Sequence, residues 1–224
     1  MKSNVNKYIF TEDLDYSQTP KSSIWGNGDS ETLQVLKKLI SEKKLFGDWL
    51  HFAAGDGRYN NLLLREVNKV FATDVDKGAL EKLQKTTPKS LSSKLFIKVQ
   101  DITKPFPFEN NTFDGVFNTG TMHLFPKSIL ELVIRETHRV LKSEGLFVFD
   151  FATDITRIKE DNTFIGRSKV AYSKITARKL LSELLKEQRF RSQFIGCKVP
   201  PEKVTSGDGT YTFSCNYWLV IAEK

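Results

Sequence analysis

The stretch Asp48-Trp49-Leu50-His51-Phe52-Ala53-Ala54-Gly55-Asp56-Gly57-Arg58-Tyr59 decides the fold of this chain. Its apolar start predicts a strand over 48–53, which runs into a turn of small residues and then into a helix over 58–67. The glycines of the turn let backbone N–H groups approach a ligand, and the helix start adds the positive end of its dipole. A second strand, predicted over 69–74, ends at Asp74, where nucleotide-binding βαβ units place a carboxylate for the ribose hydroxyls. The stretch therefore predicts a cofactor that contains a nucleoside.

The turn does not complete the fingerprint of a dinucleotide site. That fingerprint needs a third glycine three residues after the second, so that the helix packs closely on the strand and a pyrophosphate fits. In this chain the third place is occupied by Asn60, so NAD fails at one of the three defining positions. The alternative is a small-x-Gly-x-Gly turn, formed here by Ala53, Gly55 and Gly57.

This second pattern resembles motif I of the class I S-adenosylmethionine-dependent methyltransferases, whose usual form is Asp/Glu-x-Gly-x-Gly-x-Gly. Two positions depart from it: His51 stands in the acidic place and Ala53 in that of the first glycine. In the family the acidic residue orients the turn and the methionine end of the cofactor. The resemblance implies S-adenosylmethionine as the cofactor, with contacts from His51, Ala53, Gly55, Gly57 and Tyr59.

Four further segments follow in the family's order, so that the resemblance covers residues 47–151. Asp74 is similar to the ribose-binding acid, with Val75 beside it. Asp101 and Ile102 close the third strand, where the family binds adenine. Residues 105–116 are similar to the entry of the fourth strand, which ends at Asn118, and residues 139–145 are similar to the turn before the fifth. The resemblance implies that Asp74, Val75, Asp101, Ile102 and Asn118 contribute to the cofactor site.

The alternation of strands and helices predicts an α/β protein with a mostly parallel sheet. The resemblance implies a three-layer α/β/α Rossmann-like fold, whose seven-stranded sheet has an antiparallel last strand. Further strands are predicted over 94–100, 113–118, 145–151, 191–198 and 212–222, with a hairpin turn at Gly207-Asp208-Gly209. Helices are predicted from a cap at Ser30, over 77–85, over 127–142 and from Thr176. We expect residues 1–46 to form an N-terminal segment with a cap helix, and 47–224 to form one methyltransferase domain.

Composition is that of a globular enzyme: 224 residues, 39% of them hydrophobic, can bury a substantial core. No apolar run reaches the length of about 18 residues that spans a membrane. The first residues show no apolar segment of a secretory signal, and Cys197 and Cys215 have no metal-ligand spacing. These features favour a cytoplasmic protein with two free thiols and no metal site.

Methyl transfer requires few catalytic groups, because displacement from a sulfonium has a neutral leaving group. Its rate depends mainly on the alignment of the nucleophile, the methyl carbon and the sulfur. His123 follows the fourth strand, where the methyltransferases that this chain resembles often carry a His or an aromatic residue facing the methyl group. It either contributes there, or it caps the next helix or packs under the loop. Asp150, at the end of the fifth strand, either binds a cationic acceptor or acts as a base, and loop or capping roles are the alternative.

The acceptor is restricted mainly by what the fourth-strand loop lacks. Residues 118–121 show no Asn-Pro-Pro-Tyr motif for base or glutamine amino groups, no catalytic cysteine and no paired acids for aminopropyl transfer. The segments left to cover the site, 1–29, 152–175 and 199–211, are short, which favours a small molecule. Within the first of these, Tyr8, Phe10, Tyr16 and Trp25 are aromatic anchors that can close over it.

Two alternatives stay open. The net charge is +7, and residues 157–203 are rich in lysine and arginine, so a methyltransferase acting on RNA or protein could use this basic face. A plain lysine-rich surface explains the same charge. The departures at His51 and Ala53 keep a third interpretation, a non-catalytic protein that binds S-adenosylmethionine. No homo-oligomeric state is predicted.

Overall fold

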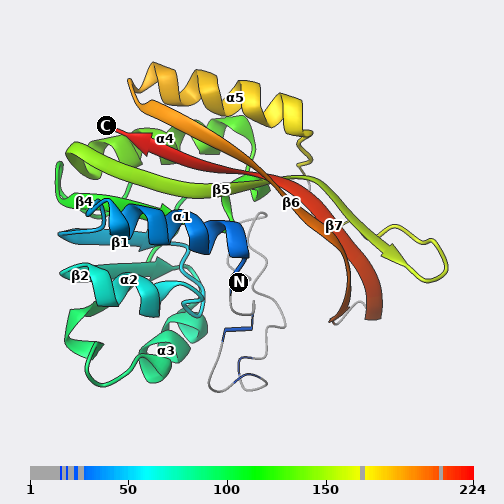
Figure 1. Cartoon of the computed structure of the whole chain (residues 1–224), viewed down its shortest axis with the longest axis horizontal. Helices are drawn as coiled ribbons and strands as arrows, with labels where there is room; N and C mark the ends of the chain where they lie inside the picture. The colour runs from blue at the N-terminus through cyan, green and yellow to red at the C-terminus, as the bar shows by residue number, and fades with distance from the viewer. Residues whose placement is uncertain (1–15, 17–18, 20–22, 25–27, 167–169, 207–208) are drawn as a thin grey trace, which may run out of the picture.

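The computed structural model describes residues 16, 19, 23–24, 28–166, 170–206 and 209–224. Seven strands form one sheet in the order β3-β2-β1-β4-β5-β7-β6 (Figure 1). The strands are β1 Asp48–Phe52, β2 Lys69–Asp74, β3 Leu95–Val99, β4 Phe113–Asn118, β5 Leu141–Lys159, β6 Arg191–Ser206 and β7 Gly209–Glu223. The helices are α1 Ser30–Ser41, α2 Asn60–Glu66, α3 Lys77–Thr86, α4 Lys127–Val140 and α5 Lys174–Glu187, with short 3₁₀ turns η2 at Ser92–Lys94 and η3 at Met122–Leu124.

Strand directions confirm the predicted topology. The pairs β1–β2, β2–β3, β1–β4 and β4–β5 are parallel, whereas β7 runs antiparallel to both β5 and β6. The order reverses between β1 and β4, since β1 is followed along the chain by β2 and β3 on one side and by β4 on the other. In open α/β sheets, ligands bind beyond the carboxyl ends of the strands at such a reversal.

Helices cover both faces of the sheet, as expected for three layers (Figure 1). On one face, Phe52, Val116 and Phe149 pack in a cluster with Ile134 of α4 and Leu181 of α5. On the other face, a second cluster joins strand residues to α1, α2 and α3: Trp49, Val70, Val148, Leu36, Leu63 and Leu80. Apolar side chains that point to opposite faces of the strands therefore form two separate cores, one on each side of the sheet.

The starts of α1 and α5 differ from the prediction in how the helix is capped. The cap of α1 is Asp29, whose side chain accepts a hydrogen bond from the Thr32 amide, so Ser30 is the first helical residue and not the cap. Helix α5 begins at Lys174, because Ser173 and Thr176 form a reciprocal capping box. A carboxylate is as good an acceptor at a cap as a hydroxyl, which is why adjacent Asp and Ser are hard to separate in sequence.

The last three strands are longer than predicted and project from the body as an arm (Figure 1). The arm consists of residues 154–159 of β5, 198–206 of β6 and 209–216 of β7. Register shifts between Thr153 and Thr156 and between Val199 and Glu202 mark where it leaves the sheet. Such bulges bend and twist a strand, which turns the arm away from the sheet. Gly209 of the predicted hairpin turn begins β7, and the other two residues of that turn lie outside the described residues.

Candidate functional site

A cavity of ≈ 310 Å³ lies at the carboxyl ends of β1, β2, β3 and β4, where the strand order reverses. Four chain segments contribute to its wall, and one residue comes from the N-terminal segment. The described residues that line it are Tyr16, His51, Ala53, Ala54, Gly55, Arg58, Tyr59, Asp74, Val75, Asp76, Gln100, Asp101, Ile102, Thr103, Thr119, Gly120, Thr121, Leu124 and Phe125. The wall is thus built where a parallel sheet of this order places a ligand.

The turn after β1 has a left-handed backbone at three of its positions. The φ angles are 47° at Ala53, 56° at Gly55 and 86° at Gly57. A Cβ on Gly57 would lie 2.3 Å from Cδ1 of Leu83, so this glycine lets the turn pack against α3. Gly57 does not line the cavity, whereas Ala53 and Gly55 do. The close approach predicted for both glycines therefore separates into one ligand-facing and one packing position.

Asp74 links this turn to the loop after β2. Its Oδ2 accepts a hydrogen bond from the Gly55 amide at 2.7 Å, and its Oδ1 accepts one from the Asp76 amide at 2.9 Å. Burial raises the pKa of Asp74 above its usual value, although these amides partly oppose the shift. A carboxylate oxygen has two lone pairs, so Asp74 keeps acceptor capacity toward the cavity.

His51 lines the cavity while its side chain is fixed from behind. Its Nδ1 lies 2.6 Å from Oδ1 of Asn60, the first residue of α2, and its ring packs edge-on against Phe117. Because an amide oxygen only accepts, Nδ1 carries the proton and Nε2 is left as an acceptor. Burial lowers the pKa of His51 to about 4, so the ring is neutral near pH 7. The acidic place of the motif thus holds a neutral acceptor.

Two polar residues, Gln100 and Asp101, follow β3, and their side chains differ in their hydrogen bonding. Oδ1 of Asp101 accepts hydrogen bonds from the amide and the hydroxyl of Thr103, at 2.9 and 2.7 Å. Gln100 is only 5% exposed, and neither polar atom of its side-chain amide has a hydrogen-bond partner among the described residues. Buried polar groups are normally paired, so Gln100 is a candidate for contact with a bound ligand.

The loop after β4 forms the opposite wall. Thr119, Gly120 and Thr121 line the cavity together with Leu124 and Phe125. The preceding Asn118 does not; its Nδ2 donates to the Phe52 carbonyl at 2.9 Å and so ties β4 to β1. The loop therefore presents hydroxyls beside an apolar surface.

The two predicted catalytic residues do not line the cavity: His123 lies within this loop, and Asp150 is hydrogen-bonded to it. Oδ1 of Asp150 accepts a hydrogen bond from the Gly120 amide at 2.6 Å, and burial raises the pKa of Asp150 to about 7. His123 packs edge-on against Phe151, with 6.4 Å between the ring centroids. Burial lowers the pKa of His123 to about 4, with a smaller contribution from the charge of Arg157.

The structure brings together eight of the twelve predicted site residues in one wall: His51, Ala53, Gly55, Tyr59, Asp74, Val75, Asp101 and Ile102. Sequence reasoning missed others that stand beside them. Arg58 directly follows the glycine turn and Gln100 directly precedes Asp101, so adjacency to the motif was a usable signal. The predicted anchor Tyr16 lines the cavity, while Tyr8, Phe10 and Trp25 lie outside the described residues.

Two kinds of feature are absent from the part of the chain that the structure describes. It contains no group of three or more His, Cys, Asp or Glu side chains placed to hold a metal ion. None of its helices combines the length and the apolar character needed to cross a membrane.

Comparison with known proteins identifies a methyltransferase domain. Residues 50–149 match the sequence model of a methyltransferase domain. No curated protein matches the chain. Among solved structures, the YcgJ protein of Bacillus subtilis has a TM-score of 0.64 at 14% identity, covering 86% of this chain and 98% of its own. A S-adenosylmethionine-dependent methyltransferase of Clostridium acetobutylicum has a TM-score of 0.61 at 13% identity, covering 92% and 97%. The complex of DhpI with SAH has a TM-score of 0.55 at 21% identity, covering 84% of each chain.

These structures share the fold, and the matched segment runs from within β1 into the first half of β5, which includes nearly the whole cavity wall. Residues 50–149 are thus a methyltransferase domain, and with the seven-stranded sheet, the glycine turn and Asp74 in place the chain has the fold of the class I S-adenosylmethionine-dependent methyltransferases.

Proposed function

We propose that this methyltransferase acts on a small-molecule acceptor. The observation that carries the proposal is the cavity wall, which joins Tyr16 of the N-terminal segment to Leu124 and Phe125 of the loop after β4. A cavity bounded by both the N-terminal segment and the loop after β4 suits a ligand that enters a pocket. Pockets of a few hundred Å³ are typical of small-molecule sites.

The strand order suggests how the cofactor lies. Asp101 follows β3, Asp74 ends β2, His51 lies in β1 and Gly120 follows β4, and these strands are neighbours in that order. With Asp74 and Val75 at the ribose, the adenine reaches Gln100, Asp101 and Ile102. The methionine end then lies beside His51 and the β4 loop. The unpaired amide of Gln100 supports a polar ligand at the adenine end.

The bound cofactor supplies an electrophilic methyl group on a sulfonium, with a neutral leaving group. The protein's task is to orient the acceptor opposite the sulfur and to keep water out. Thr119 and Thr121 offer hydroxyls that can orient an acceptor, while Leu124 and Phe125 offer apolar contact. Alignment of this kind contributes up to about 7–11 kcal/mol in well-oriented reactions.

We assign Asp150 and His123 to the acceptor side of the site through this loop. Asp150 holds the Gly120 amide at 2.6 Å and so sets the loop's position. His123 lies within η3, between Thr121 and Leu124. Asp150 acts in this proposal by holding the cavity-lining Gly120, and His123 belongs to the same loop. Neither side chain lines the cavity, so a direct proton transfer would require the loop to move.

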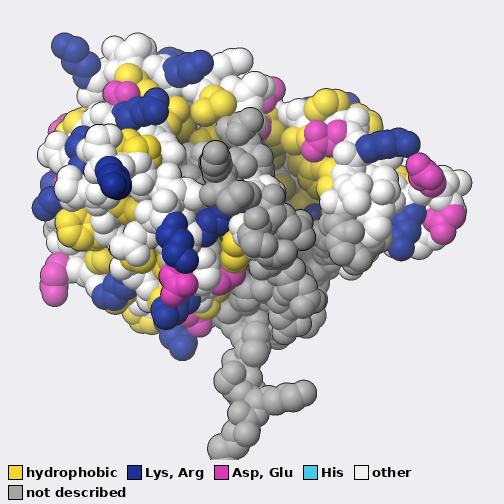
Figure 2. Space-filling model, turned by 90° about the horizontal axis from the view of Figure 1, so that it is seen from below, with side chains coloured by type: hydrophobic (Ala, Val, Ile, Leu, Met, Phe, Trp, Pro, Cys, Tyr) yellow, Lys and Arg dark blue, Asp and Glu magenta, His cyan; other side chains and the backbone are white. Residues whose placement is uncertain are grey.

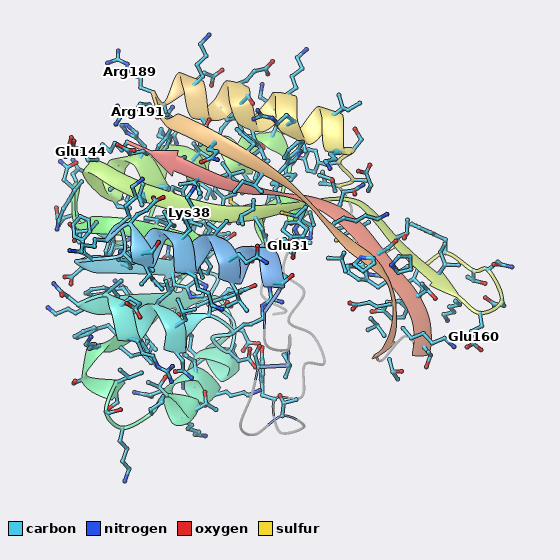
Figure 3. The ribbon with its side chains drawn as sticks, in the orientation of Figure 1. Glu31, Lys38, Glu144, Glu160, Arg189 and Arg191 are labelled. Atoms are coloured by element: carbon cyan, nitrogen blue, oxygen red, sulfur yellow. The ribbon has the colours of Figure 1, made fainter. Side chains whose placement is uncertain are left out.

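The distribution of charge weighs against the alternative of RNA or protein as acceptor. Figure 2 shows lysine and arginine side chains scattered over the visible face with acidic ones between them. Arg189 and Arg191 lie at the end of the molecule opposite the arm, whose tip carries Glu160 (Figure 3). Lys203 of the arm is paired with Glu160 at 3.1 Å, and Arg191 is paired with Glu223. Arg189 and Arg191 therefore lie apart from the basic residues of the arm, such as Lys203.

The first experiment is isothermal titration of the purified protein with S-adenosylmethionine, S-adenosylhomocysteine and NAD. We expect binding of the first two and none of NAD. A screen of small acceptors with labelled methyl groups then tests turnover. Methylation of bulk tRNA or of protein, with strongly salt-sensitive binding, would instead support the macromolecular alternative. Cofactor binding without turnover on any acceptor class would support a non-catalytic role.

A further inference from the structure

Tyr16 contributes to the cavity from outside the segment that defines the family. It lines the cavity together with Asp74, Val75 and Asp76, although it stands 60 residues before Asp76 in the chain. Its hydroxyl donates a hydrogen bond to Oδ2 of Asp76 at 2.7 Å. Burial, with the carboxylate of Asp76 beside it, raises the pKa of Tyr16, so the hydroxyl stays a donor. The ring thus stands against the part of the wall assigned to the ribose.

The two carboxylate oxygens of Asp76 have different partners: Oδ2 accepts the Tyr16 hydroxyl, and Oδ1 caps α3. Oδ1 of Asp76 caps α3 by accepting hydrogen bonds from the amides of Gly78 and Ala79. The capping fixes the carboxylate in one orientation, which leaves Oδ2 directed at Tyr16. The position of the ring is therefore tied to the start of α3.

A buried ion pair anchors other residues of the same N-terminal segment. Nζ of Lys82 lies 2.7 Å from Oδ2 of Asp56, and their side chains are 8% and 0% exposed. Asp56 stands between the two glycines of the turn and accepts hydrogen bonds from the Ser23 hydroxyl at 2.6 Å and the Ile24 amide at 2.8 Å.

Lys82 completes the anchor on the α3 side. Its ammonium also donates to the Thr19 hydroxyl at 2.7 Å and lies 5.6 Å from the centroid of the Tyr16 ring. A charge buried this deeply needs all of its partners, since an unpaired one would be costly. The Asp56–Lys82 pair is satisfied by Thr19, Ser23 and Ile24, so the pair and the N-terminal segment stabilise each other.

We infer that Tyr16 is a cofactor-binding residue, and that Asp56 and Lys82 are positioning residues which hold it over the ribose end of the cavity. The inference rests on the cavity being the cofactor site, as proposed above. Because Asp56 belongs to the glycine turn, the element that receives the cofactor also binds Ser23 and Ile24, which follow Tyr16 in the chain. Tyr16, held in this way, should slow the release of the bound cofactor more than it changes any chemical step.

The test compares the release of S-adenosylhomocysteine from the full-length wild type and from the triple variant Tyr16→Phe/Thr19→Val/Ser23→Ala. These changes remove three hydrogen bonds of the N-terminal segment and leave both charges of the buried pair in place. We expect release, followed by stopped-flow competition, to be faster by about tenfold to a hundredfold. With any acceptor that is turned over, KM for S-adenosylmethionine should rise.

The matched control is Ser92→Ala/Thr112→Val, which removes two hydroxyls bonded to backbone carbonyls in exposed turns. It should release the product at the wild-type rate, and far-UV circular dichroism should show that both variants are folded. The single variant Tyr16→Phe serves if the triple variant does not fold. Wild-type release from a folded variant would overturn the inference. Failure of the wild type itself to bind either cofactor form would instead overturn the proposed site and the inference together.

Discussion

The indole of Trp49 lies against Gly115, so closely that a Cβ on the glycine would be 2.1 Å from Cε2 of the ring. The two residues are direct partners in the parallel pair β1–β4, and Trp49 is fully buried. This is the place where the strand order reverses, and the carboxyl ends of the same two strands frame the cavity. Gly115 is therefore required by the packing of the sheet and not by its backbone conformation.

Gly115→Ala should destabilise the fold. The added methyl group forces the Trp49 ring or the β4 backbone to move, and overpacking of this kind costs about 1–3 kcal/mol. Urea unfolding followed by tryptophan fluorescence measures the change. Gly166→Ala is the control, because a Cβ there meets nothing within 4 Å. Equal midpoints for the two variants would contradict the packing described at Trp49.

Asp74→Asn should weaken the binding of S-adenosylmethionine. The amide side chain keeps the size of the carboxylate but loses its charge and half of its acceptor capacity. Hydrogen bonds to a charged group contribute about 1.5–3 kcal/mol, so Kd should rise roughly tenfold or more. Titration calorimetry measures it, with Asp161→Asn in an exposed loop as the control. An unchanged Kd would mean that the ribose lies elsewhere.

The same reasoning gives a pH dependence for cofactor binding. Burial raises the pKa of Asp74, so its carboxylate gains a proton at a higher pH than a free aspartate does. Affinity should therefore fall on acidification before ordinary carboxylates titrate, and Asp74→Asn should flatten that part of the profile.

The strands and the ligand-binding edge were predictable because local patterns encode them. The apolar run of β1, the glycine turn and Asp74 lie within 48–74, and β1–β2 pairing brings them together. Val75, Asp101 and Ile102 follow the next strand ends in the same way.

The arm was not predictable in the same way, because its strands break the local rules. The bulge between Thr153 and Thr156 shifts the alternation of β5, and Asp154 has a left-handed backbone, φ 49°. Pro200 and Pro201 lie within β6 and argue against a strand. They are tolerated because β6 is the last strand of the sheet, where a missing N–H breaks no ladder on the outer side.

The covering of the cavity depends on contacts between distant residues. The bond between Tyr16 and Asp76 spans 60 residues, and the pair Asp56–Lys82 spans 26. Neither follows from spacing, since a tyrosine hydroxyl or a lysine ammonium has many acceptors within reach of its chain. Only the folded sheet selects among them.

His51 should remain a neutral ring with its proton on Nδ1 from pH 8 to pH 5. Its pKa is about 4 because of burial, and the Asn60 oxygen fixes the tautomer. Long-range ¹H–¹⁵N spectra of ¹⁵N-histidine protein distinguish the tautomers directly. Asn60→Asp puts a carboxylate 2.6 Å from Nδ1 and should raise this pKa strongly. A wild-type His51 that titrates near 6.5 would refute the assignment.

Asp150→Asn should stabilise the protein at pH 8 and leave its stability nearly unchanged at pH 4. The folded-state pKa of Asp150 is about 7, above its ordinary value of 3.8, because the carboxyl is buried. Between these values the folded state holds a proton that the unfolded state has lost, so wild-type stability falls as the pH rises through this window. The asparagine keeps an acceptor for the Gly120 amide and does not ionise.

The difference in unfolding free energy between Asp150→Asn and wild type should therefore grow by about 1.4 kcal/mol per pH unit across the window. Urea unfolding at pH 4, 5.5, 7 and 8 measures it. The lowered pKa values of His51 and His123 act in the opposite direction, but they are shared by both proteins and cancel in the difference. A constant difference across this range would mean that Asp150 is ionised in the folded protein and that Gly120 is held by a carboxylate throughout.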